Sequence, residues 1–213
     1  ALPAPWSRAA RRGGRRGGGP RPLGEAPAGN PGLALALVAA RRGYRLTLVV
    51  PDKMSREKVL HLRALGAEVV TTRSDVVKGH PDYYQDLAER IARQTGAWYV
   101  NQFANPANPL AHETGTGPEI ARQMEGRLDA MVCGVGSGGT LTGLSRFFAR
   151  AIPGCEMVLA DPEGSVLAGV GSTGRVGVGR ARLGGGVRGG LPPPPLGPAP
   201  GRPGPPLPRR VGP

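Results

Sequence analysis

The sequence predicts an α/β fold in which parallel sheets are flanked by helices. Three observations support this prediction. Short apolar runs typical of strands alternate with segments whose apolar residues recur at helical spacing. A glycine-rich turn over 134–139 joins one such strand directly to a helix. Strands separated by helices are typical of parallel βαβ units, which bind ligands at the carboxyl ends of their strands.

The expected elements follow one another in a regular order. Helices are expected at Leu33–Arg42, Ser55–Leu65, Pro81–Gln94 and Pro118–Met124, and from Thr140 onward. Strands are expected at Arg45–Val50, Glu68–Thr71, Trp98–Val100 and Glu156–Asp161, and in the apolar run that begins at Ala130. The segment Asn101–Pro109 is expected to be a loop.

Local signals set several of these boundaries. Gly43 and Gly66 should end helices, and Ser55 can cap one with its hydroxyl. Pro51 should stop a strand, whereas Pro81 suits the first turn of a helix. In the last helix, Leu141, Leu144 and Phe147 should face inward.

Composition divides the chain into a central part and two tails. Ala1–Gly24 and Val170–Pro213 together hold 13 Arg and no acidic residue, whereas 25–169 holds 15 basic and 15 acidic residues. Tails rich in Arg, Gly and Pro bury little apolar surface, so we expect both to be disordered. Because these residues share GC-rich codons, we hypothesise that both tails are frameshift products. A nucleic-acid partner is not favoured, since Trp6 is the only aromatic residue in either tail.

The stretch AMVCGVGSGGTLTG, residues 130–143, is the strongest functional signal. Backbone N–H groups in such a turn converge, and the helix that follows adds partial positive charge, so a phosphate is the expected ligand. Ser137 and Thr140 can add hydroxyl donors. The stretch also satisfies the dinucleotide pattern G-x-G-x-x-G at Gly134, Gly136 and Gly139, with Asp161 about 20 residues further on. An NAD(P)-binding oxidoreductase therefore remains an alternative.

A longer set of motifs resembles the pyridoxal-phosphate-dependent β-family. The segments that carry the resemblance are EAPAGNPG (25–32), PDKMSREKV (51–59), LRALGAEVV (62–70), NQFANPANPLAH (101–112), HETGTGPEI (112–120), GSGGT (136–140) and DPEGSVLA (161–168). They resemble cystathionine β-synthase and cysteine synthase (O-acetylserine sulfhydrylase) most closely. The resemblance covers about 25–168. It implies an incomplete fold-type-II enzyme, similar to the tryptophan synthase β-subunit.

The resemblance implies a division into domains, a cofactor and a reaction. The expected segments are a tail at 1–24, a smaller α/β domain at 25–109, part of a larger cofactor-binding domain at 110–169 and a tail at 170–213. The cofactor would be pyridoxal 5'-phosphate. The reaction would replace the β-substituent of serine or O-acetylserine with a thiol or sulfide. Members of the family usually form homodimers.

The resemblance also implies roles for individual residues. The cofactor phosphate would be bound by Gly136, Ser137, Gly138, Gly139 and Thr140. Asn30 would contact the phenolic oxygen of the cofactor ring. The substrate carboxylate would be bound by Ala28, Gly29, Pro31 and Gln102. From the residues alone, Asn30 would be an ordinary turn residue, Gln102 a loop-packing amide, and His112 a buried, hydrogen-bonded histidine.

The chain departs from the family pattern in two places. The family's carboxylate loop reads Thr-Ser-Gly-Asn-Thr-Gly, but residues 27–32 read Pro-Ala-Gly-Asn-Pro-Gly, so three hydroxyls are missing. The Schiff-base lysine of the family should precede Glu25, where the chain has no lysine. The chain's three lysines, Lys53, Lys58 and Lys78, match no such position. The sequence therefore predicts an inactive chain with no catalytic residue of its own.

Other classes of protein receive little support. No metal-ligand spacing is evident, and no segment is long and apolar enough to span a membrane. The two cysteines, Cys133 and Cys155, favour a reducing cytoplasm as the location. An RNA-binding protein acting through its Arg/Gly tails is the remaining alternative.

Overall fold

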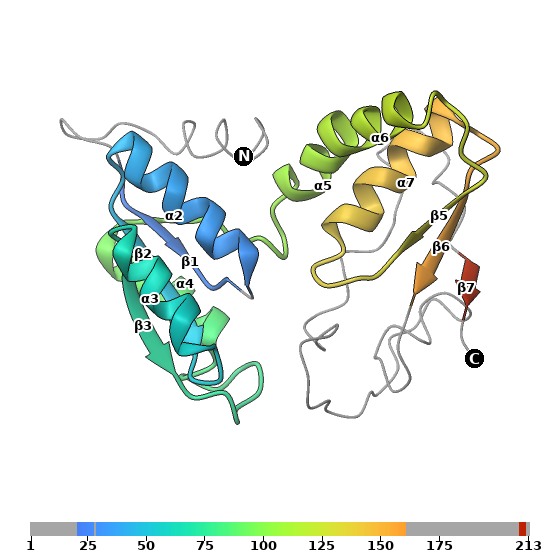
Figure 1. The fold of residues 1–213 in the computed structure, drawn as a ribbon. Coiled ribbons are helices and arrows are strands. Elements are labelled where there is room, and N and C mark those ends of the chain that lie inside the picture. Colours follow the sequence, from blue (N-terminus) through green and yellow to red (C-terminus); the bar gives the residue numbers. More distant parts are fainter. Residues whose placement is uncertain (1–20, 28, 161–208, 212–213) are drawn as a thin grey trace. The chain divides into compact units, whose positions relative to one another are not determined.

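The computed structural model describes residues 21–27, 29–160 and 209–211 (Figure 1). The chain divides into two compact units, Ala1–Asn105 and Pro106–Pro213. This division lies four residues before the domain boundary expected from the sequence. Among the described residues, no helix combines the length and apolar character needed to cross a membrane.

The first unit is a four-stranded parallel sheet covered by helices. Its elements are β1 (Leu23–Glu25), α2 (Asn30–Arg42), β2 (Leu46–Pro51), α3 (Arg56–Ala64), β3 (Glu68–Thr72), α4 (Tyr84–Thr95) and β4 (Trp98–Tyr99). The strand order is β3-β2-β1-β4, and every pair is parallel. The carboxyl ends of all four strands therefore lie at one edge of the sheet.

Alternate residues of β2 pack on opposite faces of this sheet. Leu48 and Val50 contact a core that includes Leu35 of α2 and Leu62 of α3. Val49 contacts Ala88 of α4 in a separate core. Helices α2 and α3 therefore cover one face and α4 covers the other, as Figure 1 shows. This layering is the parallel α/β arrangement that the sequence predicts.

Strand β1 is not predicted from the sequence. Leu23 lies in the stretch predicted to be an N-terminal tail, but its side chain is only 1% exposed in the core. The Leu23 N–H donates to the Arg45 carbonyl at 2.8 Å, and the Trp98 N–H donates to the Pro22 carbonyl at 2.8 Å. The strand has only three residues, which is too short for a periodic pattern. Its partners on both sides determine its conformation.

Most other elements match the sequence-based prediction, with shifted boundaries. Helix α3 begins after Ser55, whose hydroxyl accepts from the Lys58 N–H at 3.4 Å, which confirms the predicted cap. Helix α2 begins at Asn30 rather than Leu33. Strand β2 ends at Pro51, as predicted, and Pro51 is its last paired residue, opposite Thr72. Pro81 does not begin a helix, because α4 starts only at Tyr84.

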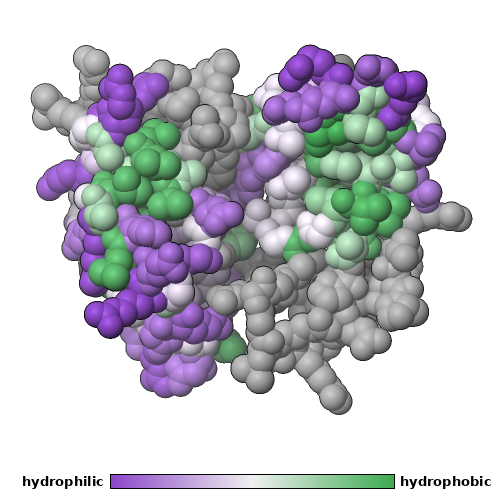
Figure 2. Space-filling view, in the orientation of Figure 1, coloured by the Kyte–Doolittle hydropathy of each residue, from purple (hydrophilic) through white to green (hydrophobic). Residues whose placement is uncertain are grey.

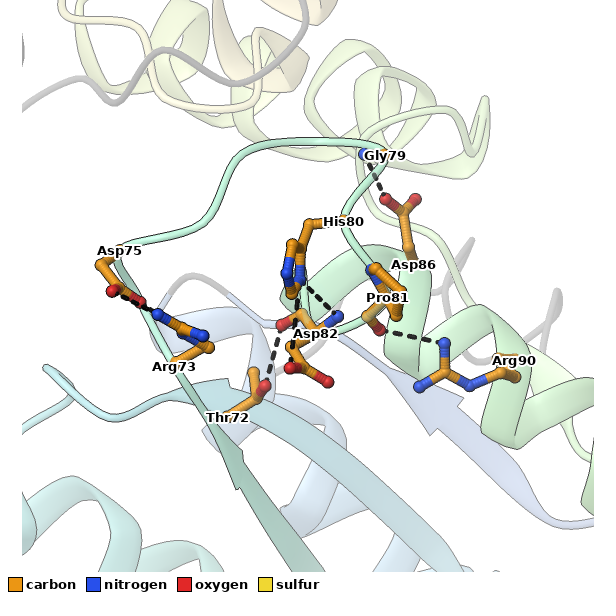
Figure 3. A network of polar contacts seen from close by, with 9 residues as sticks. All are labelled: Thr72, Arg73, Asp75, Gly79, His80, Pro81, Asp82, Asp86 and Arg90. Atoms are coloured by element: carbon orange, nitrogen blue, oxygen red, sulfur yellow. Dashed lines mark hydrogen bonds and ion pairs between the residues drawn. The ribbon is translucent and has the colours of Figure 1, made fainter.

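Side-chain contacts with the loop between β3 and α4 explain the late start of α4 (Figure 3). The Thr72 hydroxyl donates to the Asp82 carbonyl at 2.8 Å. The Asp86 carboxylate accepts from the Gly79 N–H at 2.8 Å, and Arg90 donates to the Pro81 carbonyl at 2.9 Å. These bonds hold the loop against β3 and α4 in a non-helical conformation.

The second unit packs a helical segment and α7 onto a parallel sheet. Its elements are α5 (Ala107–Ala111), the π-helical turn η1 (His112–Thr116), α6 (Gly117–Gln123), β5 (Ala130–Cys133), α7 (Gly139–Ala151), β6 (Glu156–Ala160) and β7 (Arg209–Val211). The strand order is β5-β6-β7, with parallel pairs. Strand β7 lies within the predicted C-terminal tail.

The loop predicted at 101–109 ends at Pro106 rather than Pro109, because α5 begins at Ala107.

Helix α7 provides three of the six buried residues in the apolar core cluster described for this unit. Leu141 and Leu144 are buried, as predicted, and pack with Met157 of β6. Phe147 also packs against this core, as predicted, although it is only partly buried. It lies against Gly117 of α6, where a Cβ atom would come within 2.7 Å of its ring. The neighbouring Phe148, which was not predicted, is fully buried.

Apolar side chains also remain exposed on the surfaces of both units. On α2, Leu37 is 54% exposed, and on β5, Val132 is 63% exposed. Figure 2 shows green areas on the surface drawn. These side chains identify no ligand, because single exposed apolar residues are common on protein surfaces.

Candidate functional site

The loop between β5 and α7 supplies hydrogen-bond donors at a helix N-terminus. The N-cap residue of α7 is Gly138, which has a φ of 82° and therefore adopts a left-handed conformation that favours glycine. Within the part of the chain that the structure describes, no side chain caps this 13-residue helix. The first backbone N–H groups of α7 are therefore left to another acceptor, and the helix dipole favours a negatively charged one.

Two hydroxyl side chains lie beside these N–H groups. Ser137 is partly buried, and its oxygen accepts from Nδ2 of Asn108 at 3.0 Å. Thr140 is also partly buried, and its oxygen lies 3.2 Å from Nε2 of His112. Each hydroxyl of the predicted loop thus contacts a polar side chain from the segment 107–116.

Close packing between helices makes both contacts possible. A Cβ atom on Gly139 would collide with the side chain of Asn108. A Cβ atom on Gly143 would collide with the Pro109 carbonyl and come within 2.7 Å of Cβ of His112. Gly139 was predicted as a phosphate-binding position, and the structure shows that it also lets Asn108 approach the loop. Apart from its two sequence neighbours, no described residue has an atom within 4 Å of a Cβ placed on Gly136, so the described structure leaves that side of the loop open.

This arrangement fits a phosphate group. The loop offers uncapped N–H groups and two hydroxyls, and residues 130–155 contain no carboxylate that would repel an anion. The sequence predicted this loop from its glycine spacing. It missed Asn108 and Thr116, although the spacing Asn108–His112–Thr116, four residues apart each time, places all three on one side of a helical segment.

The first unit holds the other predicted site residues. Asn30 is exposed and is the first residue of α2, whose N-cap is Gly29. Pro31 is exposed in the first turn of this helix, and Ala28 lies outside the described residues. Gln102 is only 4% exposed, and its side-chain amide donates to the Ala26 carbonyl at 3.5 Å.

Glu25 connects the two loops that hold these residues, and the sequence analysis did not identify it as a site residue. Its carboxylate accepts from the Ala26 N–H at 2.7 Å and from the Gln102 N–H at 3.1 Å. Burial raises the pKa of Glu25 to about 7, although both hydrogen bonds favour the charged form. Glu25 therefore fixes the start of the 26–32 loop relative to Gln102.

The other candidate residues from the sequence form no additional catalytic or metal site among the described residues. His112 is half-buried and hydrogen-bonded, in line with the non-catalytic interpretation of its sequence. The described residues contain no group of three or more His, Cys, Asp or Glu side chains that could hold a metal. Cys133 and Cys155 are free, and burial raises the pKa of both thiols. Asp161 lies outside the described residues.

Comparison with known proteins identifies the family. The family model described as "Pyridoxal-phosphate dependent enzyme" matches residues 7–182. The chain belongs to this family. The match extends beyond 25–168 at both ends, so the family resemblance is longer than the motifs indicate. Pyridoxal phosphate is the cofactor of this family, as the sequence analysis expected.

Individual relatives agree with this membership. Cystathionine beta-synthase of Oryctolagus cuniculus is 44% identical over 145 residues, which cover 68% of this chain and 26% of that protein. Cysteine synthase 3 of Caenorhabditis elegans is 44% identical over 149 residues, which cover 70% of this chain and 44% of that protein. The chain therefore spans less than half the length of either curated relative.

A solved structure supports the fold assignment. The crystal structure of O-ureido-L-serine synthase matches with a TM-score of 0.69 and 33% sequence identity, over 78% of this chain and 52% of that chain. The predicted fold-type-II architecture is thereby confirmed.

Proposed function

We propose that this chain binds the phosphate of pyridoxal phosphate at Gly136–Thr140 and forms part of a β-replacement enzyme of sulfur amino-acid metabolism. The observation that carries the proposal is the uncapped N-terminus of α7 beside two oriented hydroxyls. The substrate would be serine or O-acetylserine, and the second reactant a thiol or sulfide. The relatives named cystathionine beta-synthase and cysteine synthase support this class of reaction.

The residues present suit binding of the cofactor better than binding of the substrate. When bound, pyridoxal phosphate supplies a ring that stabilises negative charge on the α-carbon of an amino acid. Asn30 would contact the phenolic oxygen of that ring. Gln102 and the loop 28–31 would bind the substrate carboxylate. Because Pro31 has no N–H and Ala28 has no hydroxyl, we expect this carboxylate site to be weak.

We further propose that the 213-residue chain does not catalyse the reaction. All three of its lysines, Lys53, Lys58 and Lys78, have exposed side chains and match no catalytic position of the family. None is therefore placed to anchor the cofactor or to take the α-proton of the substrate.

Two broader features of the whole protein remain predictions. Family members usually form homodimers, so we propose a homodimer for the complete protein. A cytoplasmic location is proposed because the chain has only two cysteines, and both are free thiols.

Binding of a phosphate-bearing ligand tests the proposed site. Pyridoxine 5'-phosphate is a suitable probe because it has no aldehyde and forms no imine with exposed lysines. We expect the chain to bind it more tightly than pyridoxine in a calorimetric titration. Replacing Thr140 with Val should weaken this binding about tenfold, the typical value of one hydrogen bond to a charged group.

Two comparisons make this test specific. The matched control is Thr114→Val, since Thr114 is exposed and its hydroxyl donates to the Leu110 carbonyl within its own helical segment. Equal affinity for the two pyridoxine probes would refute the phosphate site. Tighter binding of NAD would favour the dinucleotide alternative. Salt-sensitive RNA binding would favour the alternative of an RNA-binding protein that acts through its Arg/Gly tails.

A further inference from the structure

Polar side-chain contacts connect the segment 107–116 with Ser137 and Thr140 at the start of α7. Nδ1 of His112 lies 3.0 Å from the Thr116 hydroxyl oxygen, and Nε2 lies 3.2 Å from the Thr140 hydroxyl oxygen. The imidazole therefore bridges two threonines, one on its own segment and one at the candidate phosphate site. One helical turn earlier, Asn108 makes the corresponding contact with Ser137.

The charge state of the imidazole limits how these contacts are made. Burial lowers the pKa of His112, which favours the neutral ring at neutral pH. A neutral imidazole has one N–H donor and one nitrogen acceptor. One threonine must therefore donate to the ring, while the other accepts from it.

We infer the direction at His112 by analogy with the contact between Asn108 and Ser137. The amide nitrogen of Asn108 donates to the Ser137 oxygen, which leaves the Ser137 O–H available for another acceptor. If Nε2 of His112 carries the proton, it donates to the Thr140 oxygen, and the Thr140 O–H is likewise available for another acceptor. Nδ1 must then accept from the Thr116 hydroxyl.

The geometry points to Asn108 and His112 as positioning residues that turn the hydroxyls of Ser137 and Thr140 into donors toward the cofactor phosphate. This inference rests on the proposed function of the loop. Thr116 has an indirect role, because its hydroxyl sets which nitrogen of His112 carries the proton. The glycines at 139 and 143 contribute by allowing the two helical segments to approach closely.

The protonated nitrogen of His112 is the first test. Nitrogen-15 NMR of the full chain should show the proton on Nε2 of His112, with the signal assigned by its loss in His112→Gln. In Thr116→Val, which removes the donor to Nδ1 but keeps the side-chain shape, this preference should weaken. A proton on Nδ1 in the unsubstituted chain would overturn the inference.

Binding of pyridoxine 5'-phosphate is the second test. We expect Thr116→Val to bind about three- to tenfold more weakly, a change typical of one misplaced hydrogen bond. Thr116→Ser keeps the hydroxyl and should restore the affinity. His112→Gln keeps an amide donor for Thr140 and should bind better than His112→Leu. The control Thr114→Val should match the unsubstituted chain, and circular dichroism should show that each variant is folded.

The outcomes separate this inference from the proposed function. If the unsubstituted chain does not prefer pyridoxine 5'-phosphate to pyridoxine, the phosphate site itself is refuted and the inference falls with it. If the chain prefers the phosphate and Thr116→Val binds as tightly as Thr114→Val, only the positioning role is overturned.

Discussion

Glu25 is the only buried acidic residue among those that the structure describes. It lies at the carboxyl end of β1, the edge of the sheet at which parallel α/β proteins bind ligands. Its carboxylate accepts the N–H of the adjacent Ala26 and the N–H of Gln102, which lies 77 residues further along the chain. A single side chain thus links the start of the predicted carboxylate loop to the predicted amide ligand.

The raised pKa of Glu25 predicts that stability depends on pH. Its pKa is about 7 in the folded chain, compared with 4.5 for an unperturbed glutamate. The folded state therefore holds the proton more tightly than the unfolded state. This difference contributes about 3 kcal/mol to the free energy of unfolding. The contribution is fully present below pH 4.5 and is lost as pH rises through 7. Urea unfolding monitored by Trp fluorescence at pH 5 and pH 8 measures this loss.

The variant Glu25→Gln isolates this effect. Its amide cannot ionise, so its unfolding free energy should change less between pH 5 and pH 8 than that of the unsubstituted chain. At pH 5 it should be less stable by about 1–3 kcal/mol, because one of the two N–H groups loses its acceptor. An equal pH dependence in both proteins would show that another group is responsible. Glu68→Gln, at an exposed position of β3, is the matched control.

At the scale of elements, the approach of α7 to the segment 107–116 determines the geometry of the candidate site. The two helical segments meet at Gly139 and Gly143, one turn apart on α7. Their close contact brings Asn108 and His112 to the loop. The same contact makes these two positions intolerant of a larger residue.

Replacing Gly143 with Ala should therefore destabilise the second unit. The added methyl group would collide with the Pro109 carbonyl, which belongs to the backbone and cannot move aside as a flexible side chain would. We expect a loss of about 1–3 kcal/mol, typical of overpacking. Thermal unfolding followed by circular dichroism measures it. Gly115→Ala is the control, because no described atom beyond its own helical turn lies within 4 Å of the added methyl group. Equal stability of the two variants would contradict the packing argument.

At the scale of the whole molecule, the chain combines a proposed phosphate-binding loop with three lysines that match no catalytic position of the family. Binding and catalysis should therefore be separable in this protein. Its net charge of +13 arises from the tails, since 25–169 is neutral, and so it gives no information about the candidate site.

We expect the purified chain to bind pyridoxine 5'-phosphate and to show no turnover above background. The assay would supply serine with homocysteine, or O-acetylserine with sulfide, in the presence of pyridoxal phosphate, and detect product by mass spectrometry. On the hypothesis that both tails are frameshift products, a protein from a coding sequence corrected at both junctions is the positive control. Turnover by the 213-residue chain would show that a lysine of this chain serves the reaction. It would also refute the predicted inactivity.

The sequence alone was sufficient to predict the alternation of elements, the parallel sheets and the glycine-rich turn between β5 and α7. Apolar periodicity and glycine spacing are local signals, so Ser55 and Gly43 identify helix ends without knowledge of their neighbours. The family also followed from motifs in a fixed order. Local signals failed at Pro81, because contacts from Thr72 and Arg90 hold that loop out of the helix.

Only the tertiary structure showed which distant residues act together. Strand β1 forms because strands on both sides pair with it. Burial raises the pKa of Glu25, and a three-residue pattern cannot predict that burial. The contacts of Asn108 with Ser137 and of His112 with Thr140 join residues 28 or more positions apart. Periodicity reports which face of an element is buried. The partner of a side chain across an interface depends on how the elements pack, and packing involves the whole unit.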